Sequence, residues 1–567
     1  MVYDKWKING YDRDDAVCLT QGGINPLIAV ILASRGVHDI DRANRFLDTG
    51  LSAVLDPFGL RDMDAAAARV SRAIKEHERV VVFGDYDVDG MTASCLLAGY
   101  LRKKGLDCDI YIPCRLDEGY GVNNNAIDDF ARKGVSLVIT VDCGVTANEE
   151  AAHAAALGID MIITDHHECR DELPDAVAVI DPKRRDCTYV NKSLAGVGVA
   201  FKLVCAVEGQ DKLQELLDEY GDLLAIGTIA DVVPVTGENR AFIRAGLEAV
   251  EKRKRPGLLH LLRGCGLEGR PLNTGNVGFA LAPRINAAGR MGRSVLSTDL
   301  LMTDDVAEAE RLAAELCELN MERRSLVTEI YDEALDMLEK NPADGPIVLA
   351  KEGWFQGVVG IVAARLAERF CVPAILISLD GDGFGRGSCR SYGGFSLYPA
   401  LEHCSALLDN YGGHEMAAGL TVAEENVPAL RKALCDYYKA NVPTPPVPTL
   451  NIDLEVVKPA LLSFRNVSAL ALLEPYGNGH PSPSLCIMDA VLASVTAIGG
   501  GSHVKLRVVF EGETFECIFF SHSPESLGVN AGDRVDIAFS PQINDFRGRQ
   551  SIQLMLIDIR PHTGGAD

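Results

Sequence analysis

Between residues 79 and 235, short apolar runs alternate with longer stretches of helical composition. The runs are VVVF, CDIYIP, SLVITV, DMIIT and AVAVI. This alternation predicts a parallel α/β sheet covered by helices. Ligands of such sheets gather beyond the carboxyl ends of the strands, so the residues that follow each run are the first candidates for a functional site.

The first run ends in an acidic loop, FGDYDVDGMTAS, with an aspartate at every second position. In an extended backbone alternate side chains share one face, so Asp85, Asp87 and Asp89 would converge and repel one another. A hard cation such as Mg²⁺ or Mn²⁺ would neutralise them. A calcium-binding EF-hand loop begins in the same way, but its twelfth position needs Glu, where this chain has Leu96, and helices should flank it.

Further acidic residues and histidines occupy matching places. Asp142 follows the run LVITV, the triplet 165–167 (DHH) follows MIIT, and Asp231 follows LLAIGTIA. Each alone has an ordinary explanation, because a strand-end Asp is often a helix N-cap and a lone His is often structural. Together they predict a mixed oxygen and nitrogen site for two divalent cations. Two ions roughly 3.5–4 Å apart suit phosphoester hydrolysis, since they activate a bridging water and clamp both reacting oxygens.

The composition is that of an ordinary soluble protein, with 47% hydrophobic and 24% charged residues. A net charge of −25 argues against a uniformly basic nucleic-acid coat, although a local basic groove stays compatible with it. The 16 cysteines include no Cys-x-x-Cys pair, and no secretory signal or membrane-spanning apolar stretch is present. We therefore expect a cytoplasmic protein with reduced thiols and no membrane partner.

The chain is expected to divide into several domains. A helix with leucines at near-helical spacing is predicted between Asp304 and Lys340, which lacks Pro and Gly, and the Pro-rich VPTPPVPT at 442–449 reads as a linker. After it, runs such as VKLRVVF and RVDIAF alternate with Gly-containing turns, which predicts a small β-barrel of the OB type. The predicted segments are a helical N-terminal cap (1–75), a catalytic α/β domain (76–303), a connecting helix (304–341), a second α/β domain (342–441) and the barrel (450–562).

The order of the motifs resembles that of the DHH phosphoesterase superfamily. The matching motifs are DYDVDG at 85–90, VDCG at 141–144, DHH at 165–167 and IAD ending at Asp231. GRGSCR at 385–390 and GGHEMAAG at 412–419 are similar to the motifs of the DHH-associated, substrate-binding domain. The stretches EGYGVN, AGVGVAFKL, PRINAAGRMG and LEPYGNGHPSP indicate the exonuclease branch of the superfamily. The resemblance spans about residues 80–560 and implies a DHH domain, a long helix, a DHH-associated domain and an OB-like barrel.

By this resemblance the catalytic centre holds two ions of Mn²⁺ or Mg²⁺. Asp142 would bridge them, and Asp87 would bind the first ion. The second ion would be bound by Asp89, His166 and Asp231 in addition to Asp142.

The resemblance gives other residues supporting roles, and the chain departs from the pattern once. His167 would contact substrate or lie behind the ligands, and Asp85 would be an outer ligand or an orienting group. Many superfamily members carry histidine four residues before the middle aspartate, where this chain has Phe83. Because Phe cannot bind metal, the first ion would rely on Asp85 or water.

Substrate contacts are also implied. Arg115, Ser388 and Arg390 match the pocket for a 5′-phosphate, although any single Arg could instead form a surface ion pair. His414, a catalytic candidate in a Gly-rich turn, could stabilise the scissile phosphate or serve only in the turn. The remaining substrate-binding candidates are Gly412 and Gly413 in that turn, and Arg284, Asn286 and Arg290, which either line a channel or cap helix ends.

The leading hypothesis from sequence is a two-metal exonuclease that removes mononucleotides from single-stranded DNA in the 5′→3′ direction, in DNA repair and recombination. One alternative is a phosphodiesterase of the same superfamily acting on short oligonucleotides or cyclic dinucleotides. Another is an inactive, Cdc45-like nucleic-acid-binding scaffold, which the intact metal-ligand set disfavours. The resemblance implies a RecQ-type helicase and the single-strand-binding protein as partners, and we expect a monomer.

Overall fold

The computed structural model describes residues 3–114, 118–119, 121–252, 254–546 and 548–563. The chain forms two compact units. The first comprises Met1–Asp48, Val447–Tyr476 and His480–Asp567, and the second comprises Thr49–Pro446 and Gly477–Gly479. The second unit carries every aspartate and histidine that the sequence predicts at the metal centre.

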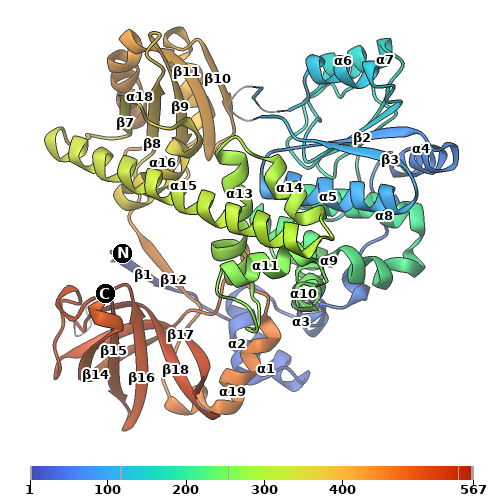
Figure 1. Ribbon diagram of the computed structural model, residues 1–567. Helices are drawn as coiled ribbons and strands as arrows, with labels where there is room; N and C mark the ends of the chain where they lie inside the picture. The colour runs from blue at the N-terminus through green and yellow to red at the C-terminus, as the bar shows by residue number, and fades with distance from the viewer. Residues whose placement is uncertain (1–2, 115–117, 120, 253, 547, 564–567) are drawn as a thin grey trace. The chain divides into compact units, whose positions relative to one another are not determined.

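A five-stranded parallel sheet forms the first half of the second unit, and Figure 1 labels two of its strands, β2 and β3. The strand order is β3-β2-β4-β5-β6. The strands are β2 (Arg79–Gly84), β3 (Asp107–Tyr111), β4 (Leu137–Val141), β5 (Asp160–Thr164) and β6 (Ala178–Ile180). Every residue of the central strand β4 is buried, as expected for a strand covered on both faces. The prediction of a parallel α/β sheet is confirmed.

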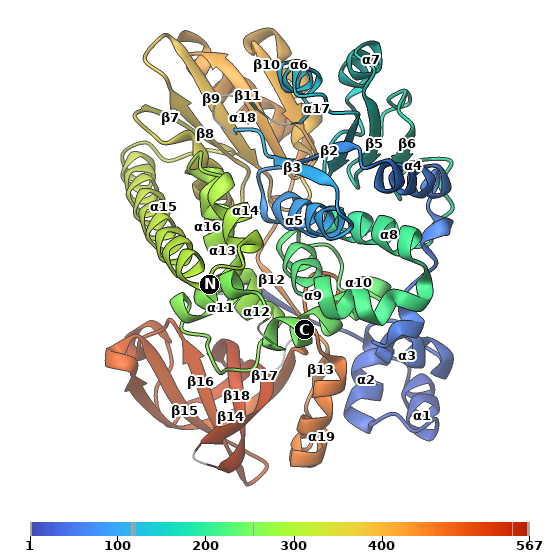
Figure 2. The same ribbon diagram turned by 45° about the vertical axis from the view of Figure 1, so that its right-hand side comes forward.

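Helices cover both faces of this sheet (Figure 2). They are α4 (Met63–Glu76), α5 (Val88–Lys103), α6 (Asn124–Arg132), α7 (Asn148–Ala156), α8 (Gly196–Glu208) and α9 (Leu213–Ala230). Val80 and Val82 of β2 belong to one core with α4, α5, α8 and α9, whereas Val81 and Phe83 belong to another with α6 and α7. Because alternate residues of a strand point to opposite faces, one continuous apolar run serves both cores.

A helical segment connects this sheet to a second one. It contains α10 (Gly237–Lys252), α11 (Pro256–Gly264), α12 (Thr274–Asn276), the π-helical η4 (Val277–Leu281), α13 (Ala282–Arg290) and α14 (Val295–Met302). α15 (Val306–Lys340) then runs for 35 residues, which confirms the long connecting helix predicted from the sequence. Neither α15 nor any other helix in the described residues has the length and apolar character needed to cross a bilayer.

The second half of this unit contains a mixed sheet in the order β10-β11-β9-β8-β7. β7 (Ile347–Glu352) and β8 (Ala374–Leu379) are parallel, and the antiparallel strands are β9 (Phe384–Arg390), β10 (Asn410–Gly413) and β11 (Ala417–Ala423). One face packs against α15 and α16 (Gln356–Phe370). The other packs against α17 (Leu397–His403) and α18 (Val427–Asn441), so this is a second α/β domain.

The C-terminal part of the first unit is a closed barrel. Its strands are β14 (Leu485–Ile498), β15 (His503–Phe510), β16 (Glu513–Phe520), β17 (Arg534–Phe546) and β18 (Arg549–Pro561). They pair in the order β14-β15-β16-β18-β17, and β17 pairs with β14 again. Five strands closed in this way form an OB-like barrel, as the sequence predicts.

The N-terminal segment is divided between the two units, whereas the sequence predicts one cap over residues 1–75. Its first elements are β1 (Lys5–Ile8), α1 (Arg13–Gln21), α2 (Pro26–Ser34) and α3 (Ile40–Leu47). β1 pairs with β12 (Thr449–Ile452), and Ile28 and Leu32 share a core with Leu485 of the barrel. Local helical patterns do not reveal which distant segment covers an apolar face, so this division could not be read from the sequence.

Candidate metal centre and active site

Acidic residues follow three neighbouring strands at one edge of the parallel sheet. Asp85 follows β2, Asp142 follows β4, and Asp165 and His166 follow β5. These strands are adjacent and parallel, so their carboxyl ends lie together. All four residues are buried, with exposed fractions of 7% or less.

The other aspartates of the acidic loop lie at the start of α5. Asp87 is the N-cap residue and accepts a hydrogen bond from the N–H of Gly90. Asp89 lies within the first turn and accepts from the N–H groups of Gly196 and Val197, at 2.6 and 2.8 Å, where α8 begins. The extended backbone assumed from the sequence therefore ends at Asp87, because α5 begins at the next residue.

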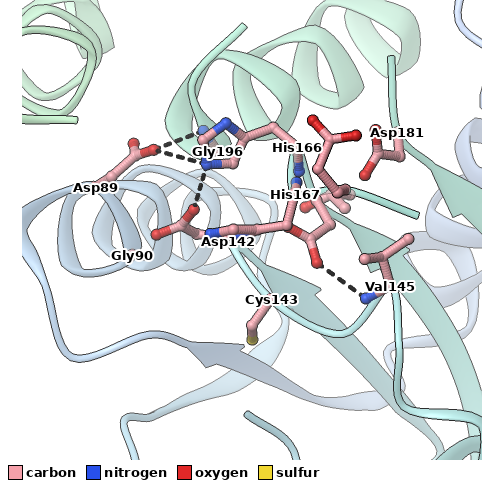
Figure 3. Close-up of polar contacts among 12 residues, drawn as sticks. Asp89, Gly90, Asp142, Cys143, Val145, His166, His167, Asp181 and Gly196 are labelled. Carbon is pink, nitrogen blue, oxygen red and sulfur yellow. Dashed lines mark hydrogen bonds and ion pairs between the residues drawn. The ribbon is translucent and has the colours of Figure 1, made fainter. Parts of the chain in front are cut away.

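Carboxylates and histidines gather around Asp142 (Figure 3). His166 Nε2 lies 3.0 Å from Asp142 Oδ1 and 4.0 Å from Asp89 Oδ2, and His166 Nδ1 lies 3.7 Å from Asp231 Oδ2. Ligand-type atoms lie within 4.8 Å of one another in three groups: Asp85, Asp87 and Asp142; Asp89, His166 and Asp231; Asp142, His166 and His167. Because Asp142 and His166 each belong to two of these groups, the three groups form one continuous cluster. We call it the Asp142 cluster; its residues are Asp85, Asp87, Asp89, Asp142, His166, His167 and Asp231.

The Asp142 cluster is unfavourable as a set of bare carboxylates. Burial and the neighbouring charge of Asp87 raise the pKa of Asp89 to about 7. Burial and the neighbouring charge of Asp89 raise the pKa of Asp231 to about 9. The same causes raise the pKa of Asp142 well above its ordinary value. Among the described residues, Asp231 Oδ2 is buried without a hydrogen-bond partner, and the buried Asp142 Oδ1 and His166 Nε2 have no hydrogen bond apart from their 3.0 Å contact with each other. A divalent cation would satisfy these atoms and offset the repulsion, so the donor set fits such an ion.

The two adjacent histidines differ in protonation. Burial and the charge of His167 lower the pKa of His166 to about 3, so His166 is neutral and suited to bind metal. Burial also lowers the pKa of His167, but the hydrogen bond and charge of Asp165 outweigh it and raise this pKa to about 9. Asp165 lies 2.7 Å from His167 Nδ1 and also accepts from the backbone N–H of Val145. Asp165 is not among the site residues predicted from the sequence, although its place immediately before two histidines was the available signal.

Phe83 lies in the apolar core and not at the Asp142 cluster. It is fully buried, and its ring stacks on that of Tyr111 with centroids 5.2 Å apart. At this position, where the resemblance implies a histidine in many superfamily members, the side chain therefore contributes to packing. Asp85, grouped with Asp87 and Asp142, is the nearby group that could bind metal instead.

The second sheet brings several predicted substrate-binding residues onto one face. Ser388 and Arg390 are two residues apart on β9, so their side chains share a face. Ser388 pairs with Gly419 of β11, which in turn pairs with Gly412 of β10. The two glycines leave the surface beside Ser388 free of bulky side chains.

A cleft of about 960 Å³ brings both halves of the second unit together. His166, His167 and Asp231 line it from the first half, and Gly413 and His414 line it from the second. The structure thus brings His414 to the same cleft as the Asp142 cluster. The described lining of this cleft does not include Ser388, Arg390 or Gly412.

The other predicted substrate contacts have different positions. Arg284 donates hydrogen bonds to Ala280 O and to Gly264 O, the last residue of α11, which corresponds to the helix-capping alternative. Arg290 donates to Gly357 O at 3.2 Å, at the start of α16. Asn286 is half-buried on α13. Arg115 lies outside the described residues.

Comparisons with known proteins identify the family. Residues 79–228 match the DHH family, N-terminal domain; residues 344–440 match the DHHA1 domain; and residues 452–558 match the RecJ OB domain. The single-stranded-DNA-specific exonuclease RecJ of Bacillus subtilis is 41% identical over 98% of this chain and 70% of its own length. The chain belongs to the RecJ family.

Other RecJ proteins agree over nearly the whole chain. RecJ of Salmonella typhimurium is 35% identical, with 94% of this chain and 96% of that protein covered. The crystal structure of RecJ in complex with Mn²⁺ from Thermus thermophilus matches with a TM-score of 0.85 at 29% identity, covering 99% of this chain and 80% of that chain. These matches confirm the resemblance to the DHH superfamily and its exonuclease branch, and they confirm the order of DHH, DHH-associated and OB domains in a RecJ fold.

Proposed function

We propose that this protein is a divalent-metal-dependent exonuclease specific for single-stranded DNA, which degrades the strand 5′→3′ and releases 5′-mononucleotides. The observation that carries the proposal is the Asp142 cluster, which borders the cleft through His166, His167 and Asp231. The names of the relatives from Bacillus subtilis and Salmonella typhimurium, single-stranded-DNA-specific exonucleases, support the same activity.

Two ions, Mn²⁺ or Mg²⁺, would bind in the Asp142 cluster, with Asp142 between them. The grouping of side chains supports this assignment, as does the Mn²⁺ complex of RecJ from Thermus thermophilus. When bound, such ions supply a strong nucleophile at neutral pH and offset the charge that develops on the phosphate. The ligands would be Asp85, Asp87 and Asp142 for one ion, and Asp89, Asp142, His166 and Asp231 for the other.

The chain's own residues would hold and orient the phosphates. His167 lines the cleft, and the hydrogen bond and charge of Asp165 raise its pKa and favour the protonated ring, which can donate a hydrogen bond to a phosphate oxygen. His414 lines the cleft from the other half and would stabilise the scissile phosphate or the leaving oxygen. Ser388 and Arg390 would bind the terminal 5′-phosphate, since a guanidinium fork matches two phosphate oxygens.

The barrel would bind nucleotides further along the strand. OB-folds hold single strands by stacking bases on aromatic rings and by a charged groove. Phe520 on β16 is 54% exposed and offers such a ring, whereas Phe515, Phe519 and Phe539 are buried. A domain of this kind favours a polymeric substrate over a dinucleotide.

The cellular setting is part of the proposal and rests on the family resemblance. A RecQ-type helicase would supply single strands, the single-strand-binding protein would cover them, and the enzyme would act as a monomer in the cytoplasm. Copurification with each partner, and mass measured in solution, would test these points separately.

Product analysis tests the polarity and the strand preference. The purified protein is incubated with Mn²⁺ and DNA that is labelled at either end, as a single strand or as a duplex. We expect early release of the 5′ label as a mononucleotide from single strands only. Early release of the 3′ label would contradict the polarity, and hydrolysis restricted to dinucleotides would favour the phosphodiesterase alternative.

A further inference from the structure

The segment that follows Asp231 has an unfavourable backbone conformation. Asp231 is the C-cap residue of α9, and its N–H donates to Gly227 O at 2.9 Å. The next residue, Val232, has a φ of 62°, in the left-handed region that β-branched residues avoid. Its side chain is 61% exposed, so packing of that side chain does not hold the conformation. Contacts to the backbone must therefore maintain it.

A turn from far along the chain supplies these contacts. Asn478 Nδ2 donates a hydrogen bond to Val232 O at 2.7 Å, and the Val235 N–H donates to Asn478 O at 2.8 Å. Gly477 permits the approach, because a Cβ at this position would lie 2.4 Å from Cγ2 of Val235. The turn Gly477–Gly479 thus holds both ends of the segment 232–235.

The two ends of this segment have different anchors. At the far end, Asn239 Nδ2 donates to Pro234 O and to Ser193 O, at 3.1 and 2.6 Å, in addition to the backbone bond from Val235. At the near end, beside Asp231, the Asn478 side chain is bonded to the strained residue itself. Removing that side chain should therefore loosen the end next to Asp231 and leave the rest of the segment attached.

We propose that Asn478 is a positioning residue for Asp231, an inference that rests on the proposed role of Asp231 as a metal ligand. By fixing the Val232 peptide, Asn478 holds Asp231 with its Oδ2 at 3.7 Å from His166 Nδ1. Residues 477–479 belong to the second unit, whereas the residues before and after them belong to the first. The C-terminal part of the chain thereby contributes to the geometry of the metal centre, which explains the GNG within the LEPYGNGHPSP stretch.

Calorimetric titration of the metal-free protein with Mn²⁺ tests this role without relying on activity. N478A should weaken Mn²⁺ binding by about three- to tenfold, the range expected for loss of one supporting hydrogen bond behind a ligand. The Mn²⁺ concentration for half-maximal hydrolysis of single-stranded DNA should rise by a similar factor, with turnover close to wild type at saturating Mn²⁺. N44A, which alters an exposed asparagine on α3, is the matched control and should leave both values unchanged.

A second substitution tests the mechanism through backbone strain. Glycine adopts a positive φ readily, so V232G should reduce the support that this peptide needs. In the V232G background, N478A should weaken Mn²⁺ binding by a clearly smaller factor than in wild type. An equal factor in both backgrounds would overturn the role of Asn478 in holding Val232.

The remaining outcomes are also decisive. Wild-type Mn²⁺ affinity in N478A would overturn the proposal, and so would a weaker affinity that comes with a lower melting temperature, because the turn would then be merely structural. If neither the wild type nor the variants hydrolyse single-stranded DNA, the proposed function is wrong, while the calorimetric comparison still decides the role of Asn478.

Discussion

Adjacent residues take different chemical roles at the Asp142 cluster. His166 is neutral and close to three carboxylates, whereas His167 is held protonated by Asp165. The sequence presents Asp165, His166 and His167 as one motif, but their environments differ. Asp165 lies within hydrogen-bond distance of His167 Nδ1, at 2.7 Å, whereas the carboxylate beside His166 Nδ1, that of Asp231, is 3.7 Å away. A protonated His167 beside the Asp142 cluster suits a site that is proposed to bind a phosphate and cations together.

Asp142 is the residue whose change should matter most. D142N keeps the shape of the side chain and tolerates the φ of 61° at this position, since Asn enters the left-handed region more readily than other residues. Loss of a shared ligand should lower turnover by about a thousandfold or more, because it removes several kcal/mol of charge stabilisation. Steady-state hydrolysis of a labelled strand measures this change.

The control for D142N is DNA binding, measured by fluorescence anisotropy without divalent ions. We expect affinity for single strands to stay within about twofold of wild type, since phosphate contacts are made elsewhere. Turnover near the wild-type rate in D142N would contradict the bridging role.

Among the elements, α8 carries the support for the carboxylates at its first turn. Its N–H groups bind Asp89, and a Cβ at Gly196 would lie 2.6 Å from Asp142 Oδ1. G196A should therefore displace Asp142 and weaken Mn²⁺ binding by about 10–100-fold, as other changes beside metal ligands do. Mn²⁺ titration calorimetry measures the effect.

Gly198, two residues further along α8, provides the matched control. A Cβ there would approach only the flexible side chain of Leu194, at 3.3 Å. G198A should keep wild-type Mn²⁺ affinity and gain a little helix stability. Equal losses in G196A and G198A would show that the effect arises from the helix and not from contact with Asp142.

At the opposite edge of the parallel sheet, Glu78 joins α4 to the strands. It accepts two hydrogen bonds from Arg69 and one from Ser136. Burial raises the pKa of Glu78, but these hydrogen bonds outweigh it and lower the pKa below the ordinary 4.5. A lowered pKa stabilises the fold above the ordinary value, and this contribution disappears as pH falls through the lowered one.

Substituting Glu78 should therefore remove a pH-dependent contribution to stability. At neutral pH, E78Q should have a lower melting temperature than wild type, by about 2–4 °C for each kcal/mol of unfolding free energy that is lost. This difference in melting temperature, the gap, should narrow as pH falls below 4.5. Melting curves across this range measure it, with the exposed Glu76 as control in E76Q. A gap that stays constant with pH would mean that the charge of Glu78 contributes nothing.

Elements that depend on local pattern could be predicted from the sequence, and those that depend on distant contacts could not. The β-branched runs predict the strands, and the polar residues that follow these runs predict that Asp85, Asp142 and His166 lie at one edge of the sheet. The hydrogen bond from Asn478 to Val232, the residue after Asp231, joins positions 246 residues apart, and no local pattern signals it. Likewise, the PRINAAGRMG motif around Arg284 is compatible with a channel-lining role and with capping of α11. Only the packing of the folded chain shows that Arg284 caps α11.

On the scale of the whole molecule, one compact unit contains the proposed active site. This unit consists of one long continuous segment and one short segment from later in the chain. Residues 49–446 contain both α/β domains, and the short Gly477–Gly479 turn rejoins them from the barrel-containing part. His166 of the Asp142 cluster and His414 lie 248 residues apart in sequence, yet both border the same cleft. An activity that requires both halves should therefore be lost when either half is altered.

The most direct test of the central claim is hydrolysis by metal-free protein as Mn²⁺ is added back. Linear single-stranded, circular single-stranded and duplex DNA are compared in parallel, and released nucleotides are quantified. The Asp142 cluster predicts no release without metal, and release from the linear single strand alone once Mn²⁺ is restored. If as many nucleotides were released without metal as with Mn²⁺, or if the circular strand were cleaved, the result would contradict a metal-dependent exonuclease.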